Sequence, residues 1–373
     1  MRRTTDLTSA TLIAVLSLAA LPVASAAEAT RQLRVELSAD PSAAFAVENL
    51  AGTMRVIPGA GRTVVAVATV HAETEEAAAL LRFEQVSDED GRPTLRVRYP
   101  IDRYGTFRYP GGDGSEIPSW LRWLGADGSR LDYDGRRVRV SSNTGILLYA
   151  DVEVQVPALK GEGTFKNHVG SLHANDVEGT LRFDTGSGDI SLEKVRGTLR
   201  ADTGSGDLKV ADAHGTLRCN TGSGDCRIER FDGDLIACNV GSGDITVRTG
   251  SAGRIDLDSG SGDVSLRDID AEEVSTDTGS GDVMIESAGA RLRKITTDTG
   301  SGDVTLRLGP DASFEARADQ GSGDLVNRYA DAQPIAEGRM VVGYRRGDGR
   351  TRIRVGTGSG DLVIEPGGAK ASR

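Results

Sequence analysis

The most regular feature of this sequence is an alternation of apolar and polar residues around a recurring turn. After one Gly-Ser-Gly-Asp turn, the apolar Ile190 and Leu192 stand on either side of the polar Ser191. Before the same turn, Leu181 and Phe183 follow the same alternation. Apolar residues at every second position predict a strand with one buried face. We therefore expect a strand on each side of the turn.

The turn itself recurs at a nearly constant interval. Gly-Ser-Gly-Asp occurs nine times, with spacings of 18 to 21 residues and a last spacing of 37. The first glycines of the nine copies are Gly186, Gly204, Gly222, Gly241, Gly260, Gly279, Gly300, Gly321 and Gly358. A period of about 20 residues is that of one solenoid coil, and stacked coils form parallel sheets with strands ~4.8 Å apart. The pattern predicts an all-β chain, a single-stranded β-solenoid (β-helix-like) of stacked two-strand coils, with glycine supplying positive φ at the turns.

The sequence before the repeat predicts more strands and one helix. Residues 31–73 alternate in the same sense and are expected to lead into the solenoid. Thr74 suits a helix N-cap, and Glu75 and Glu76 suit a first turn, so residues 74–82 are expected to form a short helix. Such a helix near the N-terminus would cap the open end of the stack and prevent edge pairing.

An aromatic-rich segment interrupts the pattern. Residues 99–149 hold eight of the 16 aromatic residues and both tryptophans. In one interpretation the segment folds back and packs its rings on the solenoid. In the other it is a recognition surface, because Trp and Tyr are favoured interface anchors. The candidate partner-binding residues are then Trp120, Trp123, Tyr104 and Tyr109.

These patterns divide the chain into six segments. The 37-residue gap after Gly321 is expected to hold a divergent coil, with a hairpin around Arg346–Gly349. The expected order is a signal peptide at 1–26, N-terminal strands and capping helix at 27–98, the aromatic-rich insert at 99–149, solenoid repeats at 150–330, the divergent last coil and hairpin at 331–365, and a tail at 366–373.

The N-terminus indicates export. Arg2 and Arg3 precede an apolar stretch, and Ala24-Ser25-Ala26 forms a small-residue cleavage site, as in a secretory signal peptide. The alternative is an uncleaved membrane anchor, for which the apolar stretch is short against the ~20 residues of a span. We expect an exported protein, periplasmic or secreted and associated with the cell envelope, with no integral membrane segment after cleavage.

Composition and charge narrow the range of partners. The chain has 48 glycines, only 11 prolines and a formal net charge of −11. Cleavage would remove Arg2, Arg3 and Asp6 and take the charge to −12. A strongly acidic chain is a poor nucleic-acid binder, because nucleic acids attract basic surfaces. The partner is unknown from the sequence, with an envelope protein or a glycan as the candidates.

The aspartate of every turn is the main candidate for chemistry. The candidate metal ligands, for Ca²⁺ only, are Asp189, Asp207, Asp225, Asp244, Asp263, Asp282, Asp303 and Asp324, and Asp361 continues the series. Stacking places these charges ~4.8 Å apart, where each pair repels by about 0.9 kcal/mol in water. Two forms of relief are open: hydrogen bonds from turn N–H groups, or Ca²⁺ as in β-rolls, which would make the protein a calcium-stabilised β-roll-like solenoid. No other cofactor is expected.

A second row of acids or amides stands two residues before each first glycine. Its members are Asp184, Asp202, Asn220, Asn239, Asp258, Asp277, Asp298 and Asp319. Arg182, Arg200 and Arg218 each lie two residues before a member, on the same strand face. We expect these arginines to offset part of the repulsion between the carboxylates.

The cysteines and the serines give little support to catalysis. Cys219 and Cys238 share one inward slot in successive coils, so they are either buried core residues, with Cys226, or a bridged pair. The serines stand in equivalent turns without a Gly-x-Ser-x-Gly elbow, and one nucleophile does not need nine copies. We expect no enzyme. A carbohydrate-active enzyme on a β-helix is the remote alternative, because the surface residues are repeated rather than unique.

The repeat resembles a known family. The features that match are the Thr-Gly-Ser-Gly-Asp turns, the Gly-Thr-Leu-Arg returns, the stretch Val47–Thr53 and the closing stretch Thr357–Ile364. They resemble a bacterial family of adhesin-like proteins with β-strand repeats, a domain of unknown function, over roughly residues 31–365. The resemblance implies a cell-envelope protein, adhesive or scaffolding, with no assigned active site.

Overall fold

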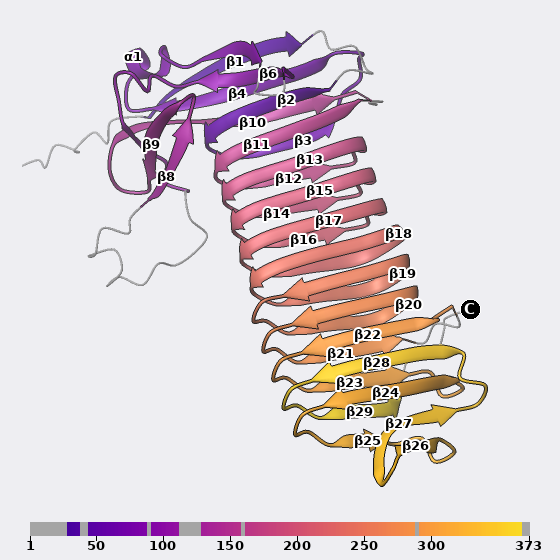
Figure 1. Cartoon of the computed structure of the whole chain (residues 1–373). Helices are drawn as coiled ribbons and strands as arrows, with labels where there is room; N and C mark the ends of the chain where they lie inside the picture. The colour runs from indigo at the N-terminus through magenta and orange to yellow at the C-terminus, as the bar shows by residue number, and fades with distance from the viewer. Residues whose placement is uncertain are drawn as a thin grey trace, which may run out of the picture.

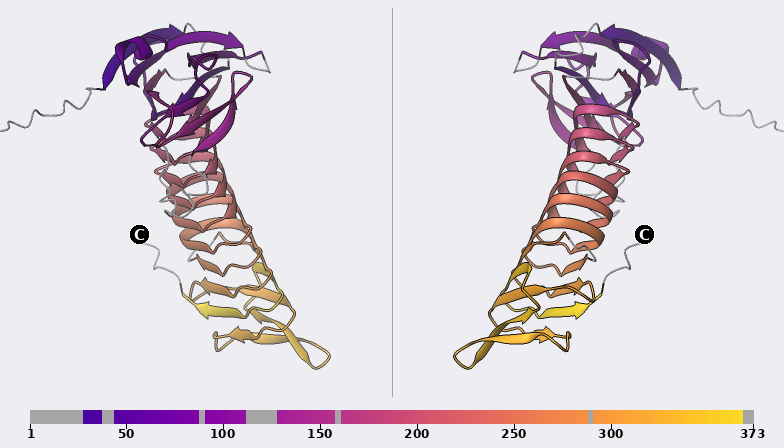
Figure 2. Two further views of the ribbon diagram at one scale, coloured as in Figure 1. Left: turned by 90° about the vertical axis from the view of Figure 1, so that its left-hand side faces the viewer. Right: turned by 90° about the vertical axis from the view of Figure 1, so that its right-hand side faces the viewer.

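The chain is almost entirely β-structure. The structure, a computed structural model, describes residues 28–37, 44–87, 91–111, 128–157, 161–287 and 291–367. Within these ranges it contains 29 strands and one helix of four residues. The strands stack into a long column that widens toward the N-terminus (Figures 1 and 2). The predicted signal peptide, residues 1–26, lies outside the described residues.

Two sheets form the long sides of the column. Along the first side the strands lie in the order β5 (Arg82–Ser87), β6 (Pro93–Arg98), β2 (Phe45–Ala51), β11 (Glu162–Val169), β13 (Glu178–Ser187), β15 (Arg196–Ser205), β17 (His214–Ser223), the later parts of β18 (Cys226–Ser242), β19 (Ile245–Ser259) and β20 (Val264–Thr278), then β22 (Lys294–Thr299), β28 (Thr351–Thr357), β24 (Phe314–Gln320), β27 (Met340–Arg346) and β26 (Gln333–Glu337).

The second side has a matching order. It runs β1 (Ala29–Leu37), β4 (Val64–Ala72), β10 (Ile146–Val156), β3 (Met54–Pro58), β12 (Leu172–Asn175), β14 (Ile190–Glu193), β16 (Leu208–Ala211), the early parts of β18, β19 and β20, then β21 (Val283–Ser287), β23 (Val304–Leu308), β29 (Leu362–Pro366) and β25 (Leu325–Asn327). From β3 to β25 all neighbours are parallel, as in a solenoid.

The alternating apolar residues face one another between the two sides. Leu181, Leu199 and Leu217 stand in register on the first side, and Ile190 and Leu208 stand in register on the second. Each is at most 1% exposed. The outward positions between them carry polar side chains. Period two in the sequence thus becomes a thin core between two sheets.

The turn glycines are required mainly because successive coils touch. Gly206 has the positive φ that was expected, +151°, but Gly262 does not lie in that region. A Cβ on Gly206 would stand 2.3 Å from the carbonyl oxygen of Gly188, and one on Gly262 would stand 1.9 Å from that of Gly243. The prediction that positive φ explains the glycines is therefore only partly right. Backbone approach between coils is the common cause.

A buried hydroxyl supports most of the turns from inside, although Val240 takes this position before Gly241. The Oγ1 atoms of Thr203, Thr221 and Thr278 donate to the carbonyl oxygens of the third turn residue one coil earlier, at 3.0, 3.1 and 2.9 Å. These threonines are at most 6% exposed. Without the hydroxyl, that carbonyl would be buried without a partner at a cost of about 1–3 kcal/mol. The Thr before Gly-Ser-Gly-Asp is thus a structural residue of the repeat.

The C-terminal coil does not lie at the end of the column. The strands β28 and β29 lie between β22 and β24 and between β23 and β25, so the last coil in sequence is inserted above the coil that precedes it (Figure 1). The segment expected to hold a divergent coil with a hairpin contains β28 and most of β29 as well as the antiparallel hairpin β26–β27, whose turn is at Gly338. Residues 347–350, where the hairpin turn was expected, join β27 to β28.

The N-terminal helix has the expected start. Helix α1 (Glu75–Ala78) is capped by Thr74, whose Oγ1 accepts the N–H of Ala77 at 3.2 Å. Its role as a cap on the stack stays a prediction. Nothing helical in the described ranges has the length and apolarity of a membrane-spanning segment.

The described part of the aromatic insert folds back onto the column. The strands β7 (Thr106–Arg108), β8 (Ser129–Tyr133) and β9 (Arg136–Ser141) form a small sheet beside β10. The rings of Tyr99, Phe107 and Tyr133 are at most 1% exposed. The Tyr99 ring meets the other two edge-on, at 5.3 and 6.0 Å. These rings act as core, as the first of the two interpretations expects.

Candidate functional site

The turn aspartates form one continuous hydrogen-bonded ladder. The carboxylate of each aspartate accepts the backbone N–H of the aspartate in the next coil of the stack, at distances of 2.8–3.1 Å. The donor and acceptor pairs are Asp207 to Asp189, Asp225 to Asp207, Asp244 to Asp225, Asp263 to Asp244, Asp282 to Asp263, Asp303 to Asp282, Asp361 to Asp303 and Asp324 to Asp361.

The ladder is a single file of carboxylates rather than a cage. Each coil contributes one turn aspartate, and its Oδ1 is already an acceptor for the neighbouring coil. Some carboxylates also lie near a basic side chain, such as Asp207 near Lys209 at 3.7 Å and Asp225 near Arg227 at 3.8 Å. Across the described ranges, no three His, Cys, Asp or Glu residues come together with the geometry of a metal site. The geometry supplies the first of the two forms of relief, hydrogen bonds from turn N–H groups.

The second row is partly neutralised by the expected arginines. Arg182 lies 3.2 Å from Asp202, and the Nε of Arg200 donates to the same carboxylate at 2.7 Å. Arg218 is exposed and forms no ion pair with any described residue. Further along the column, this row consists of exposed carboxylates such as Asp258. The row therefore changes from paired charges near the N-terminus to exposed carboxylates in the later coils, and Arg317 and Arg354 occupy the outward arginine position again in the last two coils.

The three cysteines are buried thiols. Cys219 and Cys238 stand side by side in register on β17 and β18, and Cys226 begins the second-side part of β18. All three are free, with exposures of 1%, 3% and 0%. Burial, and next a hydrogen bond with Cys219, raises the pKa of Cys238 well above its ordinary value. Cys226 and Cys238 thus have the environment of core residues rather than of nucleophiles, whereas hydrogen bonds with Cys226 and then Cys238 lower the pKa of Cys219.

The candidate aromatic residues do not form one described surface. Trp120 and Trp123 lie outside the described residues. Tyr104 is half-buried, with the guanidinium of Arg103 5.3 Å from its ring centre. Tyr109 is only 7% exposed and packs against Tyr149 at 5.0 Å. Tyr109 thus belongs to the core of the insert and is not an exposed anchor.

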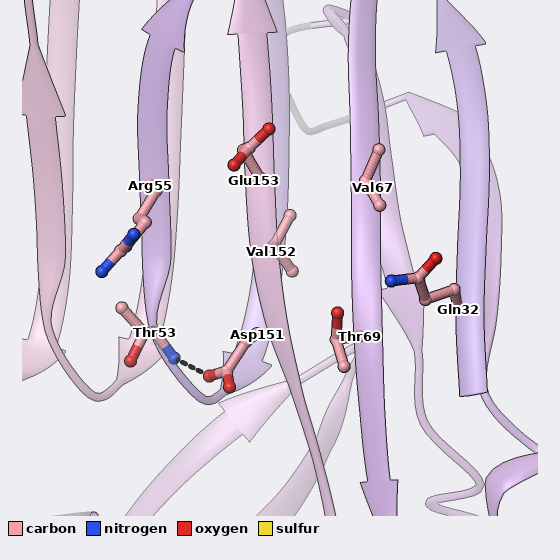
Figure 3. Close-up of a pocket in the computed structure, with 8 residues that line it drawn as sticks. All are labelled: Gln32, Thr53, Arg55, Val67, Thr69, Asp151, Val152 and Glu153. Carbon is pink, nitrogen blue, oxygen red and sulfur yellow. Dashed lines mark hydrogen bonds between the residues drawn. The ribbon is translucent and has the colours of Figure 1, made fainter. Parts of the chain in front are cut away.

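A polar hollow lies where the second side changes from parallel to antiparallel pairing. Strand β10 is parallel to β3 and antiparallel to β4, which is in turn antiparallel to β1. Residues of these four strands, together with Thr53 in the turn before β3, line a hollow of about 450 Å³ (Figure 3). The lining residues are Gln32, Thr53, Arg55, Val67, Thr69, Asp151, Val152 and Glu153.

The hollow carries charges of both signs beside hydroxyl groups. Arg55 is exposed and has no ion pair in the described part of the chain. It faces His173 in the neighbouring strand, and burial first, then the charge of Arg55, lowers the pKa of that histidine. Asp151 and Glu153 stand on β10, the other neighbour of β3, where Glu153 is in register with Arg55 and Asp151 accepts the N–H of Thr53. Such a mixture suits a polar ligand that offers both an anionic group and hydroxyl or amino groups.

A cluster of polar side chains around His71 fixes one wall of the hollow. The Oδ1 of Asp151 accepts the N–H of Thr53 at 2.8 Å, and its Oδ2 lies 3.2 Å from the Nε2 of His71. The Nδ1 of His71 lies 3.1 Å from Glu28, and the imidazole stacks on Tyr149 at 4.6 Å. Burial, and then Glu28, raises the pKa of Tyr149. Because both ring nitrogens of His71 face carboxylates, the cluster orders the wall and leaves no free nitrogen as a base.

A second charged group is buried behind the insert. The carboxylate of Glu48 lies 2.7 Å from the Nε2 of His168 and 2.6 Å from the Nε of Arg96, and Arg96 also binds Asp134 at 2.7 Å. Asp134 is bound by Arg98 as well. Burial opposes ionisation of Glu48, but His168 and Arg96 outweigh it and lower its pKa to about 2. This network connects the β8–β9 hairpin to strands β2, β6 and β11 of the first side.

Sequence reasoning did not find the hollow or the buried network. Arg55 and Asp151 belong to strands whose alternation marks them only as outward positions. Glu48 and Arg96 are also polar residues between apolar ones, and only the fold of the insert covers them. The one available signal was their position outside the repeat. Residues that do not recur from coil to coil are not explained by the stacking of the coils, and they are therefore candidates for another role.

Comparison with known proteins gives one family match over much of the chain. The model of a family described as Toastrack DUF4097 matches residues 136–231 and residues 197–365, which together cover more than half of the 373 residues. The comparison with curated proteins finds no match.

Similar solved structures share little sequence with this chain. A "putative lipid binding protein" from Parabacteroides distasonis is 13% identical, with a TM-score of 0.41 over 90% of this chain and 96% of that one. A "putative adhesin" from Parabacteroides merdae is 12% identical, with a TM-score of 0.33 over 90% and 96%. Another from Bacteroides fragilis is 13% identical, with a TM-score of 0.32 over 90% and 97%.

Proposed function

This chain belongs to the DUF4097 Toastrack family, and on that premise we propose that it is an exported, non-catalytic protein of the cell envelope, an adhesin or binding scaffold. Its long sides present outward rows of polar side chains that repeat from coil to coil. A repeated surface suits attachment to an extended or multivalent partner, whereas a reaction needs one unique arrangement of groups.

The observation that carries the proposal is the hollow at the end of these rows. It is the place on the second side where unique charges, Arg55 and Glu153, replace the repeated pattern. Its volume of about 450 Å³ matches a small polar unit such as a sugar or a short peptide. We propose that Arg55 binds an anionic group of an envelope glycan or peptidoglycan, with Thr53 and Thr69 donating to hydroxyl groups.

Binding measurements on the full chain test the proposal. The probes are purified peptidoglycan fragments and an array of acidic glycans, with retention on the immobilised polymer as the readout. Arg55→Glu should weaken retention at least tenfold, because the charge facing the ligand is reversed. The matched control is Arg248→Glu, which changes an exposed and unpaired arginine in the middle of the column.

Three outcomes would contradict the proposal. Absence of retention on every envelope polymer would remove the binding function, and equal losses for Arg55→Glu and Arg248→Glu would move the site away from the hollow. Release of soluble product from any polysaccharide would favour an enzyme instead.

A further inference from the structure

The segment between the last two Gly-Ser-Gly-Asp turns leaves the column and returns to it at one place. β23 ends at Leu308 and β28 begins at Thr351, and both residues line a single hollow of about 340 Å³ together with Pro310. Residues 309–350, here called the cap segment, therefore have their two ends close together. They contain the coil of β24 and β25 and the hairpin of β26 and β27.

The column is complete without the cap segment. β28 lies directly on β22, with Ile353 beside Ile295, and β29 lies directly on β23, with Leu362 beside Val304. The ladder also continues across this step, since the N–H of Asp361 donates to Asp303 at 2.8 Å. The true last coil is thus the C-terminal one, and the cap segment covers its free edge.

The cap segment reproduces the contacts of an ordinary coil on that edge. The N–H of Asp324 donates to the carboxylate of Asp361 at 2.8 Å, and the N–H of Leu362 donates to the carbonyl of Asp324 at 2.9 Å. The N–H of Gly321 donates to the carbonyl of Thr357 at 3.0 Å. The edge of β28 and β29 therefore recognises a Gly-Ser-Gly-Asp coil through backbone groups and one carboxylate.

This coil is less well buried than the coils above it. Leu325 is only partly buried, whereas Leu362 and Val304 in the equivalent slots are 0% exposed. The exposed large apolar residues of the described chain all belong to the cap segment: Val326 at 37%, Met340 at 72% and Val341 at 46%. Phe314 and Tyr329 are buried in the cap segment, but its β25 strand and its hairpin bury less apolar area than the coils above. A unit with less buried apolar area opens at a lower free energy than the rest of a fold.

Two short connections, residues 309–313 and 347–350, hold the cap segment to its own chain and are here called the neck. The Oγ of Ser313 accepts the N–H of Gly349 at 3.0 Å and donates to the carbonyl of Arg346 at 3.1 Å. Gly347 and Gly349 both have positive φ, at 64° and 73°. Two short glycine- or proline-containing connections that meet at one point are a suitable hinge for moving the segment as a unit.

We propose that the cap segment is displaceable, and that the edge of β28 and β29 is a recognition surface for the cap segment of a second copy of this chain. Exchange leaves every backbone hydrogen bond between cap and edge unchanged, because the bonds form between the same residues of two chains. It requires that the neck opens and that β24 and β25 separate from β28 and β29, including the bond from the Tyr329 hydroxyl to the carbonyl of Leu308. The proposal holds whatever the protein binds elsewhere. Within one chain the cap returns at high effective concentration, so the monomer is the resting state.

Amide hydrogen exchange and light scattering on the full-length chain test whether cap segments are swapped between two chains. The chain is held concentrated in urea just below its main unfolding transition, returned to buffer and separated by size. Amides of β24 and β25 should exchange at least tenfold faster than those of β22 and β23. A species of twice the chain mass should form during the incubation and separate again only slowly on dilution.

A cross-linked variant provides the matched control. Val326 lies beside Val363 in register, so Val326→Cys with Val363→Cys, bridged by a short bis-maleimide, ties the cap to its own chain. The bridged chain should stay monomeric, and the same double variant without the bridge should dimerise. The proposal is overturned if the amides of β24 open only together with β22, if an open cap gives no dimer, or if the bridged chain dimerises equally.

Discussion

A single aspartate at each corner has two opposing effects on the stack. Its carboxylate accepts the N–H of the next coil, and its charge repels the carboxylates above and below. The hydrogen bond is short and charge-assisted, so it outweighs a repulsion of about 0.9 kcal/mol in water. The sequence predicted the repulsion, because alignment on the turn places one aspartate per coil, and it gave the hydrogen bond as one of two possible forms of relief.

Substitution of one ladder member separates the two effects. In Asp263→Asn the amide oxygen still accepts the N–H of Asp282, and one repulsive charge is gone. We expect a melting temperature equal to or above that of the native chain. Asp263→Ala removes the acceptor and should lower the melting temperature by about 2 °C, for a loss of about 1 kcal/mol. A lower melting temperature for both variants would show that the charge itself is needed, as in a metal site.

The buried Glu48 predicts a defined acid sensitivity. Its pKa is lowered from 4.5 to about 2 in the folded chain, although burial alone would raise it, because His168 and Arg96 stabilise the charge. The ionised group therefore stabilises the fold fully above about pH 4.5, and this contribution is lost as the pH falls toward 2. The size is on the order of 3 kcal/mol.

Glu48→Gln tests this dependence. The variant should be less stable than the native chain at pH 7, and its stability should change less between pH 4.5 and pH 2.5 in urea titrations. The matched control is Glu178→Gln, which changes an exposed carboxylate on β13. An unchanged acid slope in Glu48→Gln would mean that other groups cause the sensitivity.

At the scale of elements, the insert is held by its hairpin turn. Asp134 has a positive φ of 51° at the turn between β8 and β9, and it binds Arg96 and Arg98 of β6. The hairpin thus adds a small sheet to the column through charged contacts at its tip and aromatic packing along its length. Both contacts are absent from the repeat pattern.

Loss of that charge should loosen the hairpin alone. Asn tolerates positive φ well, so Asp134→Asn keeps the turn and weakens both ion pairs. We expect amide exchange in β8 and β9 to become several-fold faster, with β13 to β17 unchanged. Asp132→Asn, on the exposed face of the same hairpin, is the control. Equal effects of the two substitutions would remove the anchoring role from Asp134.

The strands were easier to predict than their order. Alternation placed Ile190 and Leu192 inside because each coil has the same two faces. It gave no order for the last coils, because the turns at Gly321 and Gly358 offer the same backbone edge. Connection geometry decides instead: the chain after Leu308 forms the cap segment first and then returns beside β22. Charged residues such as Glu48 escaped prediction because burial by a distant insert leaves no periodic trace.

For the molecule as a whole, the ladder predicts independence from calcium. Each turn carboxylate is already an acceptor within the stack, and the stack uses the same bond at every step. The melting temperature should be the same within about 1 °C in millimolar Ca²⁺ and in a chelator. A rise of several degrees with Ca²⁺ that is reversed by chelation would favour the calcium-stabilised alternative.

Continuity of the column is the claim on which the binding surface and the cap both depend. It is tested most directly by cross-linking pairs of introduced cysteines with a short thiol reagent and mapping the products by mass spectrometry. Val363 lies beside Thr305 on one side and beside Val326 on the other, so Thr305→Cys with Val363→Cys and Val326→Cys with Val363→Cys should both cross-link. Thr305→Cys with Val326→Cys should not, since a whole coil separates the two strands at ~9.6 Å. Efficient cross-linking of that third pair would place the coils in chain order and contradict the inserted C-terminal coil.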